Sequence, residues 1–381
     1  MKANYYAARF AVTLLLGITV ASHAIAQPKG PPEDCGLELR VELPSTEVEA
    51  FGPIIAQVAL VNTGSNPQTI AAQDETCPYG LSLTTVTADG IETKHSLWLT
   101  RNGPQPDQIV LRPGDSLVGQ ILVLMTYADD MVFTSPGRYT TRWSWASPGC
   151  DTVRSRESVL KVIPPSASSV ALLKSIEKAA LAYFTGEPEP TVDEDDPQVS
   201  KALRRQATVL LARIILERIP QSDLVPSGKL DVRDENLVKA LESAIATNPN
   251  AVLAPYVARY LGRLQAKRFE SIVSQSGLKL WHSNEVPSRL ETEYAEASKA
   301  RDQALHYLRQ ACQDDLWPAE AALSRLARVQ LISENWDEVA ACTAKLRALQ
   351  TTNADKAADQ LDAEAARYRH KLEERKGRTH E

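Results

Sequence analysis

The sequence is poor in cysteine and has no large excess of charge of either sign. Five cysteines in 381 residues are too few for a disulfide-dense scaffold. The 42 basic and 48 acidic residues leave a net charge of −6, which argues against a nucleic-acid partner held through its phosphates. The apolar fraction of 43% is that of a globular chain rather than of a multi-pass membrane protein. The length predicts about two domains.

Common catalytic motifs are also missing. The chain contains no H-E-x-x-H zinc motif, no G-x-S-x-G nucleophile motif and no G-x-x-x-x-G-K phosphate loop. Histidine, the usual general base near neutral pH, occurs only six times. We therefore expect a protein that is not an enzyme and that holds no cofactor and no metal.

Residues 1–26 have the pattern of a secretory signal peptide. Lys2 and Arg9 form a positive start, residues 10–20 form an apolar run, and Ala24 and Ala26 mark a small-x-small cleavage site. The apolar run is shorter than the about 20 residues that cross a bilayer. The pattern predicts a periplasmic or secreted protein that begins at Gln27 and has no integral membrane segment after cleavage.

Apolar and polar residues alternate along the first half of the chain. Leu37, Leu39, Val41 and Leu43 are separated by charged residues, and the same period of two recurs up to residue 162. Turn-forming Gly, Pro, Asn and Asp residues lie between these runs. After a linker at 27–34, the pattern predicts an all-β sandwich over residues 35–163.

Two segments of this half resemble an immunoglobulin-like domain. They are LRPGDSL at 111–117 and PGRYT at 136–140. The resemblance implies that Tyr139 has a structural role, in which its hydroxyl ties the Pro-Gly turn to the next strand. Antibody domains have a cysteine two residues after this tyrosine, whereas this chain has Thr141.

The immunoglobulin-like strand order also suggests a structural disulfide between Cys77 and Cys150. Cys77 precedes the strand near Leu81, and Cys150 follows a strand that would be its antiparallel neighbour. Cys35 is expected at the same end of the domain and can replace either partner. A metal site built from the three thiolates and His95 is the alternative.

A helical period begins after the Pro164-Pro165 pair. Apolar residues then recur at i, i+3, i+4 and i+7, which predicts an α-helical domain over 164–371 and a C-terminal tail over 372–381. The WDEV segment at 336–339 and the DQA segment 35 residues before Asp337 resemble tetratricopeptide repeats. This resemblance implies an α-solenoid, and an irregular helical array is the alternative. The predicted fold class is therefore α+β with two domains.

A few other residues have chemistry to consider. The acidic run at 187–196 suits either a Ca²⁺ loop or a solvated loop. Trp98 and Trp145 are candidates for stacking on a sugar, with Trp145 expected to be partly exposed, whereas Trp143 is assigned to the core. Cys312 and Cys342 are either buried free thiols or a disulfide.

Together these features favour an exported, non-enzymatic binding or scaffold protein. Helical arrays and sandwich edges both present surfaces to other proteins, so we expect a protein partner in the cell envelope. A carbohydrate or cell-wall binding module is the first alternative. The second is an inhibitory role, because residues 111–145 also resemble the sandwich of small proteinase-inhibitor domains.

Overall fold

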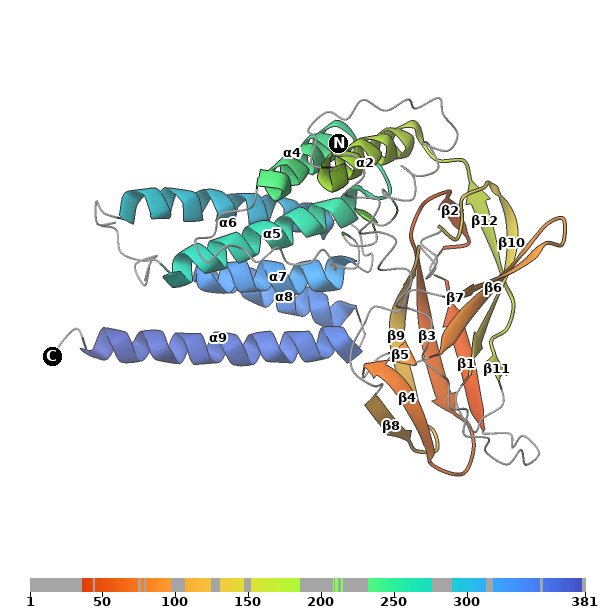
Figure 1. Ribbon diagram of the computed structural model, residues 1–381. Coiled ribbons are helices and arrows are strands. Elements are labelled where there is room, and N and C mark those ends of the chain that lie inside the picture. The colour runs from red at the N-terminus through yellow and green to blue at the C-terminus, as the bar shows by residue number, and fades with distance from the viewer. Residues whose placement is uncertain are drawn as a thin grey trace, which may run out of the picture.

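A computed structural model describes most of the chain after residue 35. The described residues are 36–43, 45–74, 77–78, 80–96, 107–124, 131–146, 152–185, 208, 210–211, 214, 232–275, 290–312, 318–349 and 352–378. The predicted signal peptide, the predicted linker at 27–34 and the acidic run at 187–196 lie outside them. The model is an α+β structure with sheets in its N-terminal part and helices in its C-terminal part (Figure 1).

The N-terminal part, which we call the β-domain, forms three sheets. Its strands are β1 (Leu37–Glu42), β2 (Glu47–Glu49), β3 (Ile54–Asn62), β4 (Gln68–Asp74), β5 (Cys77–Pro78), β6 (Leu81–Thr87), β7 (Glu92–Ser96), β8 (Asp107–Leu111), β9 (Ser116–Val123), β10 (Gly137–Trp145), β11 (Val153–Arg154) and β12 (Ser158–Ile163). The strand orders are β1-β3-β9, β2-β12-β10-β6-β7 and β5-β4-β8, and β11 pairs with β10. Every pairing is antiparallel except that of β12 with β2.

The first two sheets pack against each other through a shared apolar core. The predicted period of two is confirmed at β3, where Ile54, Ala56, Val58 and Leu60 are all buried and the residues after Ala56 alternate between buried and half-buried. Strand β10 behaves in the same way and contributes its aromatic residues to the core. Alternation along a strand places every second side chain on one face, and that face is the one these sheets bury.

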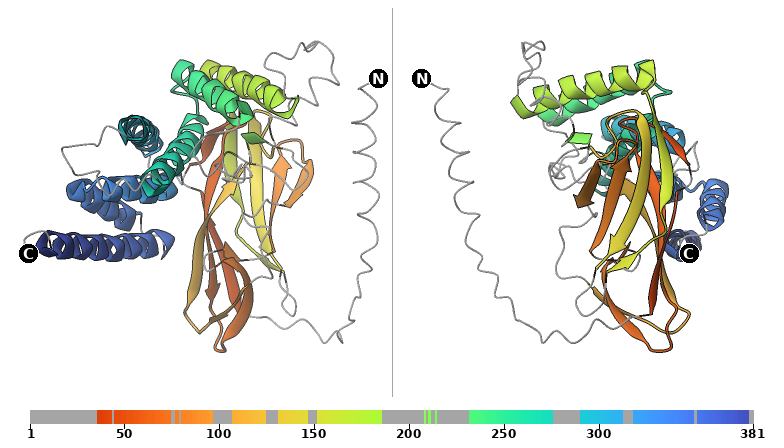
Figure 2. Two further views of the ribbon diagram at one scale, coloured as in Figure 1. Left: turned by 60° about the vertical axis from the view of Figure 1, so that its left-hand side comes forward. Right: turned by 90° about the vertical axis from the view of Figure 1, so that its right-hand side faces the viewer.

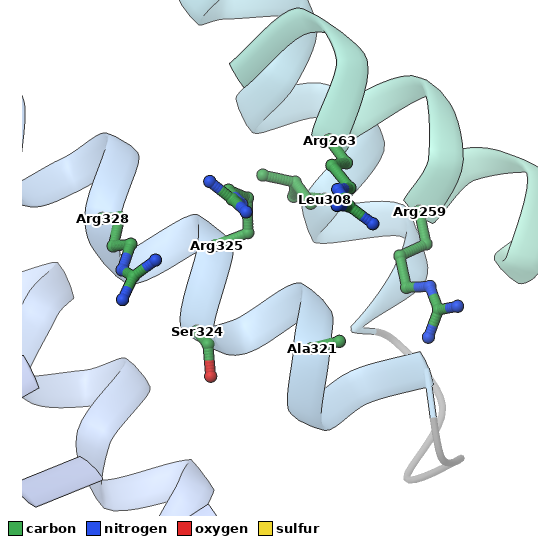
Figure 3. Close-up of a pocket in the computed structure, with 7 residues that line it drawn as sticks. All are labelled: Arg259, Arg263, Leu308, Ala321, Ser324, Arg325 and Arg328. Atoms are coloured by element: carbon green, nitrogen blue, oxygen red, sulfur yellow. The ribbon is translucent and has the colours of Figure 1, made fainter. Parts of the chain in front are cut away.

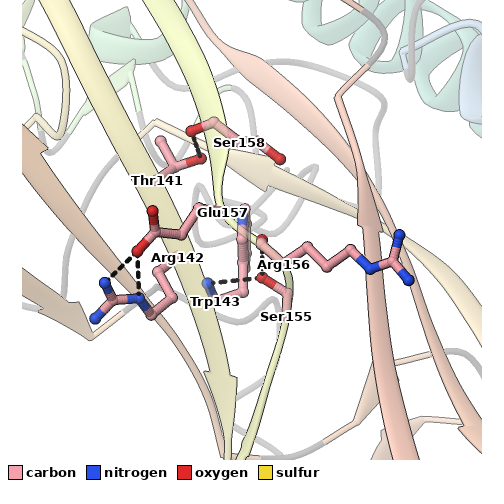
Figure 4. A network of polar contacts seen from close by, with 7 residues as sticks. All are labelled: Thr141, Arg142, Trp143, Ser155, Arg156, Glu157 and Ser158. Carbon is pink, nitrogen blue, oxygen red and sulfur yellow. Dashed lines mark hydrogen bonds and ion pairs between the residues drawn. The ribbon is translucent and has the colours of Figure 1, made fainter.

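Polar contacts hold β10 against the segment that leads into β12 (Figure 4). The backbone N–H of Trp143 donates to the Ser155 hydroxyl at 3.1 Å, and the Ser155 N–H donates to the Trp143 carbonyl at 2.9 Å. On the exposed face, Arg142 forms an ion pair with Glu157. These contacts satisfy the backbone beside a fully buried indole ring.

The C-terminal part, which we call the helical domain, contains seven helices among the described residues. They are α2 (Ala167–Thr185), α4 (Val232–Thr247), α5 (Ala254–Gln275), α6 (Glu291–Ala311), α7 (Pro318–Ile332), α8 (Trp336–Ala348) and α9 (Thr352–Arg378). Helices α2 and α4 lie across one end of the β-domain, and α5 to α9 stack beside it (Figure 2). The predicted end of this domain at residue 371 falls inside α9, which continues to Arg378.

Helices that follow one another in the sequence also pack together in space. Helix α5 packs on α6, α6 on α7, α7 on α8, and α8 on α9, while α5 also contacts α7. The predicted apolar stripes form this core, as at Leu323, Leu326 and Ala327 of α7. A stripe of this spacing covers one side of a helix, so each helix buries that side against its neighbours.

A carboxylate of the β-domain anchors the start of α2. The Glu49 Oε2 atom accepts hydrogen bonds from the Ser169 hydroxyl at 2.7 Å and from the Ser166 N–H at 3.3 Å. Ser166 also caps the helix, because its Oγ accepts the Ser169 N–H at 3.3 Å. Ile55 and Leu124 of the β-domain extend into the apolar core of the helices. The two domains therefore share both a polar and an apolar contact.

Candidate functional site

A cationic pocket opens between α5, α6 and α7. Its volume is about 190 Å³, and its described lining consists of Arg259, Arg263, Leu308, Ala321, Ser324, Arg325 and Arg328 (Figure 3). Helix α5 supplies two of the arginines one turn apart, and α7 supplies the other two one turn apart. No carboxylate is among these described lining residues, although the chain as a whole is acidic.

The close approach of α5 and α6 positions one wall of this pocket. Gly262 lies between the two arginines of α5, and a Cβ atom built on it would be 2.7 Å from the Cγ of Leu308. A real side chain at this position would push α6 away. Glycine therefore lets α6 approach α5 closely enough for Leu308 to line the pocket.

Burial and mutual repulsion both act on the cations of this region. Arg259 is only 2% exposed, and burial lowers its pKa to about 10, which leaves it protonated at neutral pH. Burial, followed by repulsion from Arg325, lowers the pKa of Arg263. Burial and repulsion by the same two arginines, Arg263 and Arg325, lower the pKa of the neighbouring Lys267. The region thus concentrates positive charge where water screens it poorly.

Two carboxylates contact the α7 arginines. The Arg325 Nη1 atom is 3.3 Å from the Glu270 Oε1 atom of α5. The Arg328 Nη2 atom is 3.6 Å from the Glu364 Oε1 atom of α9. These ion pairs orient two guanidinium groups beside the cavity. A guanidinium group is a planar fork of N–H donors that matches carboxylate and phosphate oxygens, so the pocket suits an anionic group.

No motif or spacing in the sequence predicted this pocket. The spacing of Arg259 and Arg263, and that of Arg325 and Arg328, matches one helical turn in each case. Such spacing also occurs on solvated helix faces, so it has little meaning by itself. The informative feature would have been Arg259, which stands in the buried apolar stripe of α5 between Ala258 and Tyr260.

The predicted Cys77–Cys150 disulfide lies outside the described residues, because Cys150 and the Cys77 side chain are not described. The same is true of Cys35. The strands on which the prediction depends are neighbours: β6 and β10 pair antiparallel, with Leu81 opposite Trp145. The pairing of the thiols stays a prediction.

Tyr139 lies at the start of β10 with its ring buried. Its hydroxyl donates a 2.9 Å hydrogen bond to the carbonyl of Ser135, across the Pro136-Gly137 turn. Its ring meets that of Phe133 edge to face, with the ring centroids 5.3 Å apart. Burial, followed by the charge of Asp89, raises the pKa of this phenol. The residue therefore joins the turn to the strand.

The expected partial exposure of Trp145 is wrong. Trp145 is 0% exposed and Trp143 is 1% exposed, because β10 turns both rings into the core between the sheets. A ring that stacks on a sugar must have one face open to solvent. Neither residue can serve as a sugar platform in this structure, and Trp98 lies outside the described residues.

His95 is buried on β7 and belongs to the β-domain. Its Nε2 atom is 2.8 Å from the Thr85 hydroxyl of β6. Burial lowers the pKa of this imidazole, so it is neutral at physiological pH. Within the described part of the chain, no three His, Cys, Asp or Glu side chains are arranged to hold a metal ion.

Cys312 and Cys342 are both free thiols. Burial, together with repulsion between charged thiolates, raises the pKa of Cys312 to about 12. Burial, and then the charge of Glu338, raises the pKa of Cys342 to about 11. Thiols with such values are almost entirely protonated near pH 7 and are poor nucleophiles.

Comparison with known proteins identifies no family. No protein-family profile matches the chain, and no curated protein matches it. Among solved structures, a β-glucosidase from Erythrobacter marinus matches at 12% identity and a TM-score of 0.21, over 33% of this chain and 15% of the enzyme. The sporulation control protein Spo0M from Bacillus subtilis matches at 11% identity and a TM-score of 0.24, over 37% of this chain and 55% of the Spo0M chain.

The bacterial hydrophobin BslA matches at 11% identity and a TM-score of 0.18, over 36% of this chain and all of its own. The chain thus spans about half of Spo0M and less than a sixth of the glucosidase. Scores this low identify neither a fold family nor an activity. In the part of the chain that the structure describes, no helix is long and apolar enough to cross a membrane.

Proposed function

We propose that this protein is an exported, non-enzymatic binding protein whose helical domain engages an anionic group of a protein partner in the cell envelope. The observation that carries this proposal is the pocket lined by four arginines in a chain of net charge −6. Like charges gathered in one place destabilise a fold, so their presence there favours a role in binding. An anionic group of a partner would add further hydrogen-bond acceptors beside these donors.

The chemistry of the lining supports binding rather than catalysis. Guanidinium groups hold and orient anions, but they do not exchange protons near neutral pH. Ser324 is the hydroxyl of the described lining, and no histidine or carboxylate accompanies it there to act as its base. The pocket is therefore suited to recognition.

We also propose that the β-domain is immunoglobulin-like, that the helical domain is a tetratricopeptide-like solenoid, and that the protein is exported. An immunoglobulin-like β-domain is supported by the antiparallel sheets that share a core and by the Tyr139–Ser135 hydrogen bond. A tetratricopeptide-like α-solenoid is supported by the way in which consecutive helices pack on one another. Export is supported by the signal-peptide pattern at residues 1–26.

A capture experiment tests the function. The mature chain, residues 27–381, is used as bait in an envelope extract from its own source. Three baits are compared: the wild type, the double variant Arg263→Gln/Arg325→Gln, and Arg301→Gln. Arg301 is the matched control, because it lies on α6 outside the pocket lining and pairs with its neighbour Asp302.

We expect one protein to be retained by the wild type and by Arg301→Gln, and to be lost from the double variant. Far-UV circular dichroism and thermal unfolding establish that the double variant is folded. Equal retention by all three baits, or retention of no protein by the wild type, would contradict the proposed function.

A further inference from the structure

We propose that the arginine pocket binds a doubly charged tetrahedral oxyanion, namely the phosphate group of a phosphomonoester, in preference to a single carboxylate. This inference rests on the proposed function, because it names the chemistry of the group that the same pocket receives. Four features of the pocket lead to it: its donors, its charge, its size and its burial.

The described polar groups of the lining are rich in hydrogen-bond donors. Each guanidinium carries five N–H donors and no acceptor, and four such groups line the cavity from α5 and α7 (Figure 3). A carboxylate has two oxygens to offer, whereas the terminal phosphate of an ester has three. A phosphate group therefore uses more of the donors that two facing helices present.

Several cations repel one another beside the pocket. Burial and then Arg325 lower the pKa of Arg263, and burial followed by Arg263 and Arg325 lowers the pKa of Lys267. The Glu270 carboxylate contacts Arg325 and offsets part of this repulsion. A dianion cancels more of it than a monoanion does.

The size and burial of the cavity suit a small group rather than a whole ligand. Its volume of about 190 Å³ exceeds the roughly 150 Å³ of a cavity that admits a benzene-sized molecule. It is smaller than the about 300–1,000 Å³ of pockets that enclose complete drug-sized ligands. Arg259 is 2% exposed, so one wall of the pocket lies away from bulk water. Charge-assisted hydrogen bonds are stronger in such a buried place than in water.

Titration calorimetry on the full mature chain tests the inference at constant ionic strength. The probes are methyl phosphate, inorganic phosphate, sulfate and acetate. At pH 7.5 we expect methyl phosphate to bind at least tenfold more tightly than acetate. We also expect it to bind at least as tightly as inorganic phosphate, because the partner carries the group covalently. Equal affinity for acetate, or binding of the free phosphate ion alone, would overturn the inference.

The pH dependence separates titration of the ligand from titration of the protein. The second pKa of a phosphomonoester is about 6, so lowering the pH from 7.5 to 5.5 reduces its dianion fraction about fourfold. Sulfate stays doubly charged over this range. We expect the affinity for methyl phosphate to fall about fourfold while that for sulfate stays constant. An equal fall for both ions would overturn the assignment.

Variants place the binding in the pocket. Arg263→Gln and Arg325→Gln should each weaken methyl phosphate binding about tenfold, as expected for one charge-assisted hydrogen-bonded pair. Arg263→Lys keeps the charge and loses the fork, so a smaller loss is expected. Arg301→Gln should leave the affinity unchanged. An equal loss in Arg301→Gln would show that only the overall charge matters and would overturn the proposed site.

The two proposals fail in different ways. If the double variant loses the captured protein while acetate binds as well as methyl phosphate, the binding function stands and the phosphate assignment is wrong. If the double variant keeps the captured protein while methyl phosphate still requires Arg263 and Arg325, the phosphate site stands and the proposed function is wrong.

Discussion

Replacing Gly262 with alanine tests whether the contact between α5 and α6 depends on a missing side chain. The added Cβ would lie 2.7 Å from the Cγ and 3.0 Å from the backbone nitrogen of Leu308. The side chain of Leu308 can rotate away, whereas its backbone nitrogen moves only if α6 moves. We therefore expect Gly262→Ala to destabilise the helical domain.

Two opposing effects set the size of the change. Alanine is favoured over glycine inside a helix by about 1 kcal/mol. Overpacking of a close contact costs about 1–3 kcal/mol, and a contact with the backbone belongs to the upper part of that range. The expected net loss of unfolding free energy is about 1–2 kcal/mol. For a domain of this size, that loss lowers Tm by about 2–8 °C.

Thermal unfolding followed by far-UV circular dichroism measures this loss, and Leu308→Ala provides the matched comparison. Alone, Leu308→Ala leaves a cavity and should cost about 2–5 kcal/mol. Combined with Gly262→Ala it should cost less than the sum, because the new methyl group occupies part of the space that the leucine vacates. A Gly262→Ala variant that melts at or above the wild-type temperature would refute this reasoning.

Three further predictions concern the β-domain. Glu49→Gln weakens the hydrogen bonds to the start of α2 and should cost about 1–3 kcal/mol by urea denaturation, whereas Glu47→Gln, at the exposed first residue of the same strand, should change stability by less than about 0.5 kcal/mol. Equal effects would mean that the junction does not depend on this carboxylate. Burial lowers the pKa of His95 in the folded state, so the unfolded chain takes up a proton first as the pH falls. The stability that the neutral His95 contributes should therefore be complete above about pH 6.5 and be lost as the pH falls below that value. His95→Gln should flatten this slope between pH 7.5 and 5, and an unchanged slope would assign it to other groups. A disulfide between Cys77 and Cys150 leaves three of the five thiols free in the denatured, unreduced protein, and thiol titration with peptide mass mapping would detect any other number or pairing.

Local periodicity predicted the buried faces of β3, β10 and α7 correctly. The buried residues of β3 and β10 and the apolar stripe of α7 were all identified from spacing alone. This succeeded because a period of 2 or 3.6 is a property of a single segment, and any partner that covers the segment buries the same face. The change from one period to the other also located the transition between Ile163 and Ala167.

The exposure of particular aromatic residues could not be predicted in this way. Trp145 stands near the end of its strand, where side chains are often exposed, yet it is fully buried. Its burial results from the second sheet and from the neighbouring strands β6 and β11, which pair with it at Leu81 and Val153. Which strand covers a given strand end depends on contacts far apart in the sequence.

The amino-acid sequence by itself determined the order of a β-rich half and a helical half and the apolar faces of strands such as β3 and helices such as α7, because these follow from patterns within single segments. Tertiary structure alone decided that Arg259 and Arg263 would face Arg325 and Arg328 across one cavity, and that Glu49 would meet the start of α2. More than 60 residues separate the two arginine pairs, and more than 110 separate Glu49 from Ser166. Only the packing of whole helices and sheets brings such residues into contact.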